Sequence, residues 1–172
     1  MNTLCTSGAL RFVWLLVAVS AVAGCGFHPR GEESLQLPAR LSPMQITGIG
    51  TSDPLYRELR AAVEDAGVTV TPSRETAQSF LVLSDREARR RVLAVNSLGK
   101  AIEYEIVEEV TFELLDRERN VLLPEFRAAR EGSYTDPTGD PLGKAAEQQL
   151  LRESKRRDLV QQIMVRLRYG TR

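Results

Sequence analysis

Residues 102–115 read IEYEIVEEVTFELL and carry the clearest structural signal in the chain. Alternate positions are apolar apart from Glu108; they are Ile102, Tyr104, Ile106, Val110, Phe112 and Leu114. Most of the intervening positions are polar, namely Glu103, Glu105, Glu109, Thr111 and Glu113. This period of two predicts a β-strand with one face packed against a core and the other face in water.

The flanking sequence extends this strand into a sheet. Residues 80–95 and 121–134 predict two further long strands, joined to the middle one by short polar turns at 96–100 and 116–120. Such short turns favour antiparallel neighbours, and therefore a three-stranded meander. Shorter apolar stretches at 44–49 and 68–70 predict one or two additional strands.

Two segments have the pattern of helices. Asp53-Pro54-Leu55 and Asp140-Pro141-Leu142 both place a capping aspartate before a proline suited to the first helical position. Apolar residues then recur at mostly helical spacing, and Gly67 and Gly170 are expected to end the two helices. The fold class predicted is α+β, with two helices packed on one face of a four- to five-stranded, mainly antiparallel sheet.

The N-terminal region has the features of an export signal. Arg11 precedes an apolar run from Phe12 to Val22, which is too short for a membrane-spanning helix. The small residues Ala23 and Gly24 then lead to Cys25, and together these residues resemble the lipobox of bacterial lipoproteins. The alternative is an ordinary secretory signal that ends on a cysteine by chance. We expect Cys25 to carry the lipid anchor.

Cleavage before Cys25 would define the organisation of the rest of the chain. Residues 1–24 would be a signal peptide, 25–43 a lipidated N-terminus with an extended leader, and 44–172 a single domain. Cys5 would be removed with the signal peptide, so the mature chain could form no internal disulfide.

Composition and motifs argue against several functional classes. Without residues 1–24 the chain has 22 basic and 23 acidic residues, a net charge of −1, which disfavours nucleic acid as a partner. The single histidine, His28, makes a catalytic triad or a zinc site improbable. We therefore expect no enzyme activity, no metal and no cofactor. The row of glutamates on the middle strand could suggest a cation site, but we favour a solvated face paired with arginines.

The densest basic cluster is Arg89-Arg90-Arg91, with Lys100 at the following turn. Strand alternation places Arg89 and Arg91 on one face and Arg90 on the other. Ion pairing and protection of a sheet edge would account for this cluster, and this is the interpretation that we favour. The alternative is contact with a phosphorylated, anionic lipid.

Several short motifs, in order, resemble one known family. The segment C-G-F-H-P-R-G at 25–31 resembles the mature N-terminus of the LPS-assembly lipoprotein LptE (RlpB) family. The segment that begins with residues 54–59 and ends with 67–68 is similar to the first-helix region of the family. Residues 101–105 are similar to one of its strands, and residues 147–167 to its C-terminal helix. Departures from the family pattern are Pro29, where leucine is frequent, and a slightly longer stretch at 138–141.

The resemblance implies an outer-membrane lipoprotein on the periplasmic side. It would plug the β-barrel LptD, help to assemble it, and insert lipopolysaccharide into the outer leaflet while binding lipopolysaccharide itself. Lys144 lies near a basic position that several members keep. Because lipid A phosphates are anionic, the candidate contacts are Arg89, Arg91, Lys100 and Lys144.

Two other hypotheses belong to different functional classes. One is a lipid-anchored structural or scaffolding lipoprotein of the periplasm that does not bind lipopolysaccharide. The other is a periplasmic enzyme on a lipid anchor, which a perturbed carboxylate in a deep cleft would support.

Overall fold

The computed structural model describes residues 36–135 and 141–171, with the side chains of 141–143 excluded. Its elements, in chain order, are the 3-10 helix η1 (Ala39–Leu41), strand β1 (Met44–Thr47), helix α2 (Pro54–Asp65), strands β2 (Ser79–Val95), β3 (Ala101–Asp116) and β4 (Val121–Thr135), and helix α3 (Pro141–Gly170). The three long strands begin and end within one residue of the predicted bounds.

The four strands form one sheet in the order β1-β2-β3-β4. Strand β2 pairs antiparallel with β3, and β3 pairs antiparallel with β4, as the short turns predict. Strand β1 is short and pairs parallel with the start of β2, from Met44 opposite Ser79 to Thr47 opposite Val82. The remainder of β2 therefore forms an edge of the sheet.

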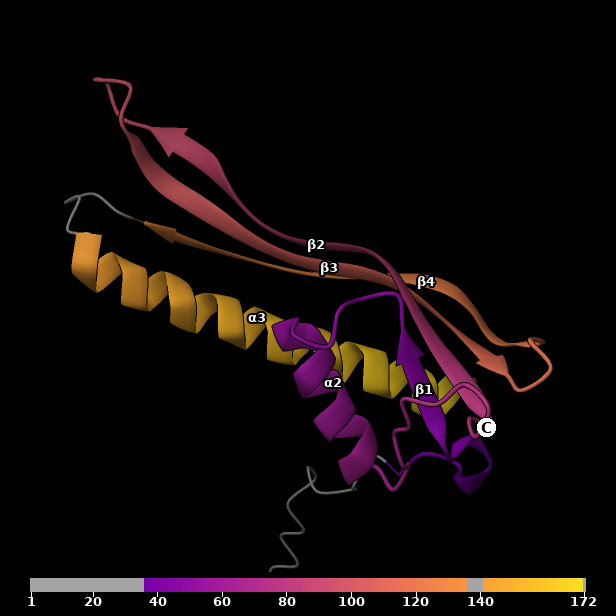
Figure 1. Ribbon diagram of the computed structural model, residues 1–172. Helices are drawn as coiled ribbons and strands as arrows, with labels where there is room; N and C mark the ends of the chain where they lie inside the picture. The colour runs from indigo at the N-terminus through magenta and orange to yellow at the C-terminus, as the bar shows by residue number, and fades with distance from the viewer. Residues whose placement is uncertain (1–35, 136–140, 172) are drawn as a thin grey trace, which may run out of the picture. The chain divides into compact units, whose positions relative to one another are not determined.

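Both helices lie on the same side of this sheet, and α3 runs along the strands (Figure 1). The predicted α+β fold is confirmed. Helix α3 approaches β4 closely at Gly132, where a Cβ atom would lie only 2.8 Å from Cε of Lys155 and 3.1 Å from Cδ1 of Leu151. A glycine at this position lets the helix lie close to the strand.

The ends of α2 follow from local chemistry. The carboxylate of Asp53 accepts a hydrogen bond from the backbone N–H of Leu55 at 2.7 Å, and Pro54 occupies the first helical position. Gly67 follows the helix with φ +86°. Both the cap and the stop were predicted from the sequence.

Gly48 positions β1 against β2. Its φ is +94°, and a Cβ atom there would lie 1.7 Å from the carbonyl oxygen of Leu83. Only glycine permits such a close approach of two backbones.

The predicted strand at 68–70 is wrong. Val70 makes only an isolated parallel bridge with Met44, in which Thr69 O and Thr71 N–H bond the backbone of Met44. Pro72 follows directly and has no N–H to continue the ladder.

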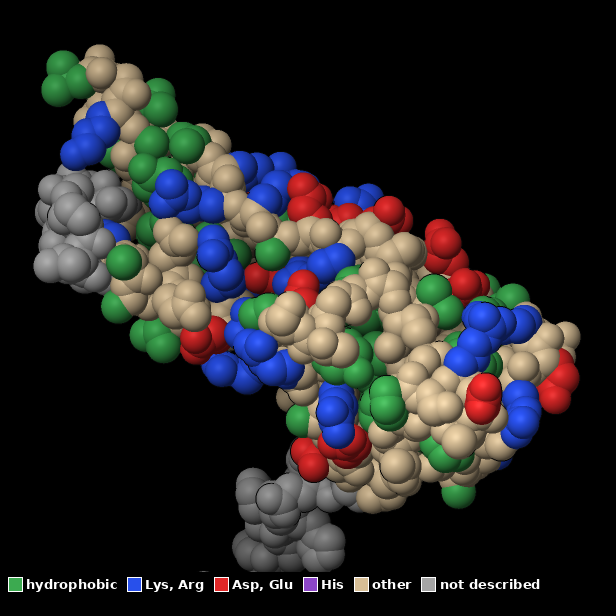
Figure 2. All heavy atoms as spheres, viewed as in Figure 1, with side chains coloured by type: hydrophobic (Ala, Val, Ile, Leu, Met, Phe, Trp, Pro, Cys, Tyr) green, Lys and Arg blue, Asp and Glu red, His purple; other side chains and the backbone are tan. Residues whose placement is uncertain are grey.

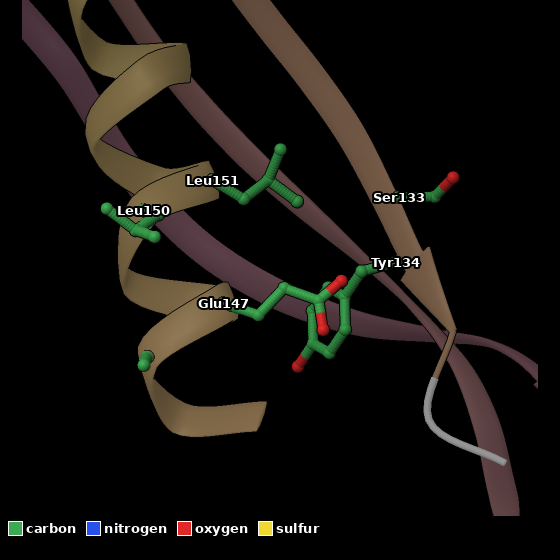
Figure 3. A pocket seen from close by; sticks show the side chains of 6 residues that line it. Ser133, Tyr134, Glu147, Leu150 and Leu151 are labelled. Carbon is green, nitrogen blue, oxygen red and sulfur yellow. The ribbon is translucent and has the colours of Figure 1, made fainter. Parts of the chain in front are cut away.

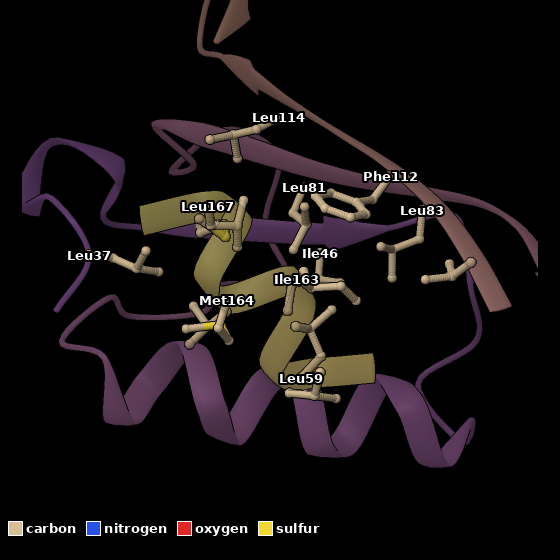
Figure 4. Close-up of a cluster of buried hydrophobic side chains, with 14 of the residues drawn as sticks. Leu37, Ile46, Leu59, Leu81, Leu83, Phe112, Leu114, Ile163, Met164 and Leu167 are labelled. Carbon is tan, nitrogen blue, oxygen red and sulfur yellow. The ribbon is translucent and has the colours of Figure 1, made fainter. Parts of the chain in front are cut away.

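The main hydrophobic core lies between the two helices and the sheet (Figure 4). Helix α2 contributes Leu55, Leu59 and Val63, α3 contributes Leu159, Ile163 and Leu167, and the sheet contributes Ile46, Leu81, Leu83, Phe112 and Leu114. Leu37 and Leu41 also join this core, although they lie in the segment expected to be an extended leader.

The outer face of β3, which lies opposite the helices, is less exposed to solvent than the sequence predicts. Glu105, Thr111 and Glu109 retain 9%, 6% and 7% of their accessible surface, so the prediction of a solvated face is wrong for this part of the strand. Strand β3 lies between β2 and β4, and long arginine side chains from both neighbours, Arg91 and Arg127, pair with its glutamates and cover them.

Candidate functional site

The helix–sheet layer has two ends with different environments. We call "the base" the end that contains η1, β1, α2, residues 156–170 of α3 and the core described above. We call "the arm" the other end, formed by residues 88–95 of β2, 101–107 of β3, 130–135 of β4 and 144–155 of α3. All four sequence-predicted contact residues lie in the arm or in its β2–β3 turn.

A buried ion pair lies where the two ends meet. A register shift between Ser84 and Glu87 turns Arg86 toward the helix side of the sheet, where its Nη2 lies 2.5 Å from Oε2 of Glu108. Glu108, which interrupts the apolar face of β3, is fully buried. Nε of Arg86 also lies 3.6 Å from Oδ2 of Asp53, the cap of α2. Arg86 therefore joins β2, β3 and the N-terminus of α2.

The β2–β3 turn holds Lys100 in an ordered loop. The side chain of Asn96 accepts hydrogen bonds from the backbone N–H groups of Leu98 and Lys100 at 3.0 and 2.9 Å. Two backbone hydrogen bonds close the same turn, and Gly99 has φ +75°. Lys100 is exposed, and no carboxylate among the described residues pairs with it.

Arg89 and Arg91 point to the outer face, as strand alternation predicts, and both are ion-paired. Arg89 pairs with Glu87 on the same strand, and this hydrogen bond raises the pKa of the Arg89 guanidinium. Arg91 pairs with Glu105 directly across the strand. The predicted pairing of the arginines with the glutamate row is therefore confirmed for Arg91.

Glu109 of the same row is held by the other neighbouring strand. Nε and Nη2 of Arg127 donate to its two carboxylate oxygens at 2.5 and 2.8 Å. These hydrogen bonds hold the pKa of Glu109 below its usual value and raise that of Arg127. Because Arg127 pairs with both of its carboxylate oxygens, Glu109 needs no metal ion to balance its charge.

Arg90 connects the hairpin to α3 and was not a predicted site residue. Its guanidinium lies over the ring of Tyr104 at 4.6 Å, and Nη1 donates to Oε1 of Gln148 at 3.0 Å. The ring of Tyr104 stacks on that of Tyr134, whose hydroxyl donates to the same oxygen of Gln148 at 3.0 Å. Strand alternation placed Arg90 on the face opposite Arg89 and Arg91, but its contacts could not be predicted, because Tyr134 and Gln148 lie 44 and 58 positions away from it in the sequence.

Lys144 lies in the first turns of α3. Its Nζ donates to the backbone carbonyl of Thr135 at 2.8 Å and to Oε2 of Glu147 at 2.7 Å. These contacts tie the start of the helix to the end of β4. The structure therefore places Lys144 in the helix layer, whereas Arg89 and Arg91 lie on the opposite face of the sheet. Cys25 lies outside the described residues.

A shallow groove of about 560 Å³ lies between the end of β4 and the first half of α3 (Figure 3). Its lining is mostly aliphatic and aromatic, and the side chain of Glu147, which is paired with Lys144, is its one carboxylate. Within 36–135 and 141–171, no three His, Cys, Asp or Glu side chains are grouped in a way that could hold a metal ion. No helix in the described part of the chain is long and apolar enough to cross a membrane.

A match to a known protein family covers most of the domain. Residues 41–167 match the family model described as LptE, lipopolysaccharide-assembly. The chain belongs to the LptE family. It is 31% identical to the LPS-assembly lipoprotein LptE of Photorhabdus laumondii over 160 residues, covering 90% of this chain and 86% of the relative. The LptE of Pectobacterium atrosepticum is 29% identical, with 88% and 80% covered.

Solved structures agree with this assignment. A lipoprotein B from Nitrosomonas europaea superposes with a TM-score of 0.61 at 27% identity, covering 81% of this chain and 88% of that one. A minor lipoprotein from Acinetobacter baumannii has the same fold, with a TM-score of 0.63 at 20% identity and with 77% and 95% covered. The protein is thus a lipid-anchored envelope protein of lipopolysaccharide assembly, and its family is not one of enzymes.

Proposed function

We propose that this LptE-family protein forms a plug in an LptD-like outer-membrane β-barrel and helps to assemble that barrel. An acylated Cys25 would hold it on the periplasmic side of the outer membrane. It would contact lipopolysaccharide through the arm and assist its insertion into the outer leaflet. The observation that carries the proposal is the family match, which extends from Leu41 to Leu167 and so includes base and arm alike.

The distribution of charge in the arm supports contact with an anionic lipid. The four candidate contacts are basic, and Lys100 has no carboxylate partner among the described residues. Arg89 and Arg91 are weaker candidates, because Glu87 and Glu105 already neutralise them. We therefore rank Lys100 first. Lys144 is also ion-paired, with Glu147, but it ranks second because its position near the start of α3 offers backbone N–H groups to a phosphate.

Co-purification tests the proposed partner. The protein, tagged at its C-terminus, is isolated from outer membranes solubilised in mild detergent, and the proteins retained with it are identified by mass. A large β-barrel in near-equal amount is expected. Recovery of the lipoprotein without a barrel would contradict the plug and would favour a scaffolding lipoprotein.

The anchor requires its own control. A Cys25→Ser variant lacks the sulfur to which the diacylglyceryl group would be attached. The protein should therefore lose the mass of the lipid and leave the membrane fraction. If the variant is still acylated and still cleaved before residue 25, Cys25 is not the anchor.

A further inference from the structure

The first half of α3 covers a small apolar floor that is separate from the main core. On the sheet beneath it lie Ile106 of β3, which is completely buried, and Tyr134 of β4, which is 7% exposed. Neither residue is part of the main core. Ile106 pairs with Gly132 across the two strands, and the helix approaches the sheet there through Leu151 and Lys155, which are only partly buried.

Polar contacts at its margins hold this half of α3 on the sheet. Oε1 of Gln148 accepts hydrogen bonds from Arg90 of β2 and from the hydroxyl of Tyr134 of β4, both at 3.0 Å. At the start of the helix, Lys144 donates to the carbonyl of Thr135 at 2.8 Å. The net stabilisation from such hydrogen bonds is small, because water competes for the same groups.

The seam between this half of α3 and β4 is not fully packed. The shallow groove of about 560 Å³ follows it, with Tyr134 on one side and Leu150 and Leu151 on the other (Figure 3). Leu150 is 65% exposed, and Figure 2 shows apolar side chains at the surface of the arm with basic side chains among them. A seam of this kind lacks the close packing of a protein interior.

The support of α3 changes at Arg156. This side chain is buried, and its Nε lies 2.6 Å from Oε1 of Glu58 on α2. From Leu159 onward the helix packs between α2 and the sheet. Segments with few buried apolar contacts open at a lower free energy than the core does. A boundary in local stability therefore lies between residues 155 and 156.

We infer that residues 144–155 form a lid on the arm, which opens while the base stays folded. Gln148 is the latch, because it joins the lid to both β2 and β4. A helix this short is marginal in water without tertiary support, so the lid unwinds when it leaves the sheet. The open form extends the groove over Ile106 and Tyr134, with Arg90 at its margin. This device goes beyond the proposed function and does not depend on it, because it requires only the chain itself.

Two introduced cysteines separate opening of the lid from unfolding of the domain. Ile106 and Val110 lie on the same strand and are both completely buried, but only Val110 belongs to the main core. The variants Ile106→Cys and Val110→Cys are prepared as mature protein in mild detergent, and their reaction with a thiol reagent is followed in urea below the unfolding transition. The unsubstituted protein gives the background, since Cys25 is its only cysteine after removal of residues 1–24.

The lid predicts that the Ile106→Cys variant reacts about a hundredfold faster or more, with a weaker dependence on urea, since local opening exposes less surface than unfolding does. Gln148→Ala removes both latch hydrogen bonds and should speed this reaction about tenfold. Leu159→Ala weakens only the base. It should speed the reaction of the Val110→Cys variant by at least about thirtyfold and leave that of the Ile106→Cys variant unchanged.

Equal acceleration of both cysteines by Leu159→Ala would overturn the lid, because the arm would then open only together with the whole domain. A reaction of the Ile106→Cys variant that Gln148→Ala does not speed would also overturn it. Hydrogen exchange of the chain without introduced cysteines is the second measurement, and it serves if either cysteine variant fails to fold. Amides of residues 148–155 should exchange before those of 159–167, and simultaneous exchange would contradict the lid.

Discussion

Helix α3 passes through two environments along its 30 residues. In the base, Leu159, Ile163 and Leu167 are completely buried between α2 and the sheet. In the arm, no residue from 144 to 155 is buried, and Leu150 keeps 65% of its surface exposed. The same helix is therefore held by apolar packing at one end and by side-chain hydrogen bonds and ion pairs at the other.

This difference indicates how the two ends divide stability and function. The base contains the main core and accounts for most of the apolar burial that stabilises the fold. The arm is held by the Arg90–Tyr134–Gln148 contacts and by Lys144, and it leaves apolar and basic groups in solvent. We expect changes in the base to alter folding and changes in the arm to alter lipid contact.

The largest loss of stability is expected at the junction. Replacing Arg86 with alanine would leave Glu108 buried and charged without its partner, at a cost of about 3–5 kcal/mol. Chemical denaturation of the variant measures this loss. The double variant Arg86→Met with Glu108→Met is the control and should recover much of it. A single variant as stable as the wild type would show that the pair does not join the two ends.

A matched pair of leucines compares the two halves of α3 directly. Leu159→Ala in the base should lower the free energy of unfolding by about 2–5 kcal/mol, because it leaves a cavity in the core. Leu150→Ala in the arm should change it by less than about 0.5 kcal/mol. Thermal or urea unfolding of both variants measures the contrast. Similar losses at the two sites would contradict the division into base and arm.

The outer face offers a smaller, pH-dependent effect. The pKa of Glu109 is lowered by its hydrogen bonds from Arg127, so the pair stabilises the fold above the carboxyl's ordinary pKa of about 4.3. That contribution is lost as the pH falls through the lowered pKa of the folded state. Since Arg127 is largely exposed, the effect should be at most about 1 kcal/mol.

The variant Glu109→Gln tests the direction of this pH dependence of stability. Urea unfolding should show the variant slightly less stable than the wild type at neutral pH, with the difference shrinking in acid. Glu103→Gln serves as a control, because Glu103 has no ion-pair partner among the described residues. A difference that grows as the pH falls would mean that the pair does not hold the charged form.

Local patterns in the sequence were sufficient for most of the fold. The period-two strands, the Asp53–Pro54 cap and the Gly67 stop each depend on a few neighbouring residues, and the structure confirms them. The partners of Arg90 and Glu108 were not foreseen, because they depend on where a bulge and a distant helix place side chains. The burial of the outer face was not predicted, because it arises from side chains of neighbouring strands: Arg91 and Arg127 extend across to the glutamates of β3 and cover them.

The helical pattern of α3 was predicted, but its change of environment was not. Leu150 and Leu159 are both apolar positions of the helical stripe, and nothing near them in the sequence separates the buried one from the exposed one. The difference arises because α2 packs beside α3 in the base and is absent from the arm.

The central claim is that the arm contacts lipopolysaccharide while the base maintains the fold. It is tested most directly by titrating lipopolysaccharide against the purified protein, the variant Lys100→Glu with Lys144→Glu, and the control Arg74→Glu with Arg117→Glu. The control makes the same change of charge at two exposed arginines outside the arm. Melting temperatures should change little, because the hydrophobic core that stabilises the fold lies in the base. The arm variant should bind about tenfold or more weakly, since one hydrogen bond to a charged group contributes about 1.5–3 kcal/mol, and the control should bind normally. Undiminished binding by the arm variant, or an equal loss in the control, would contradict the claim.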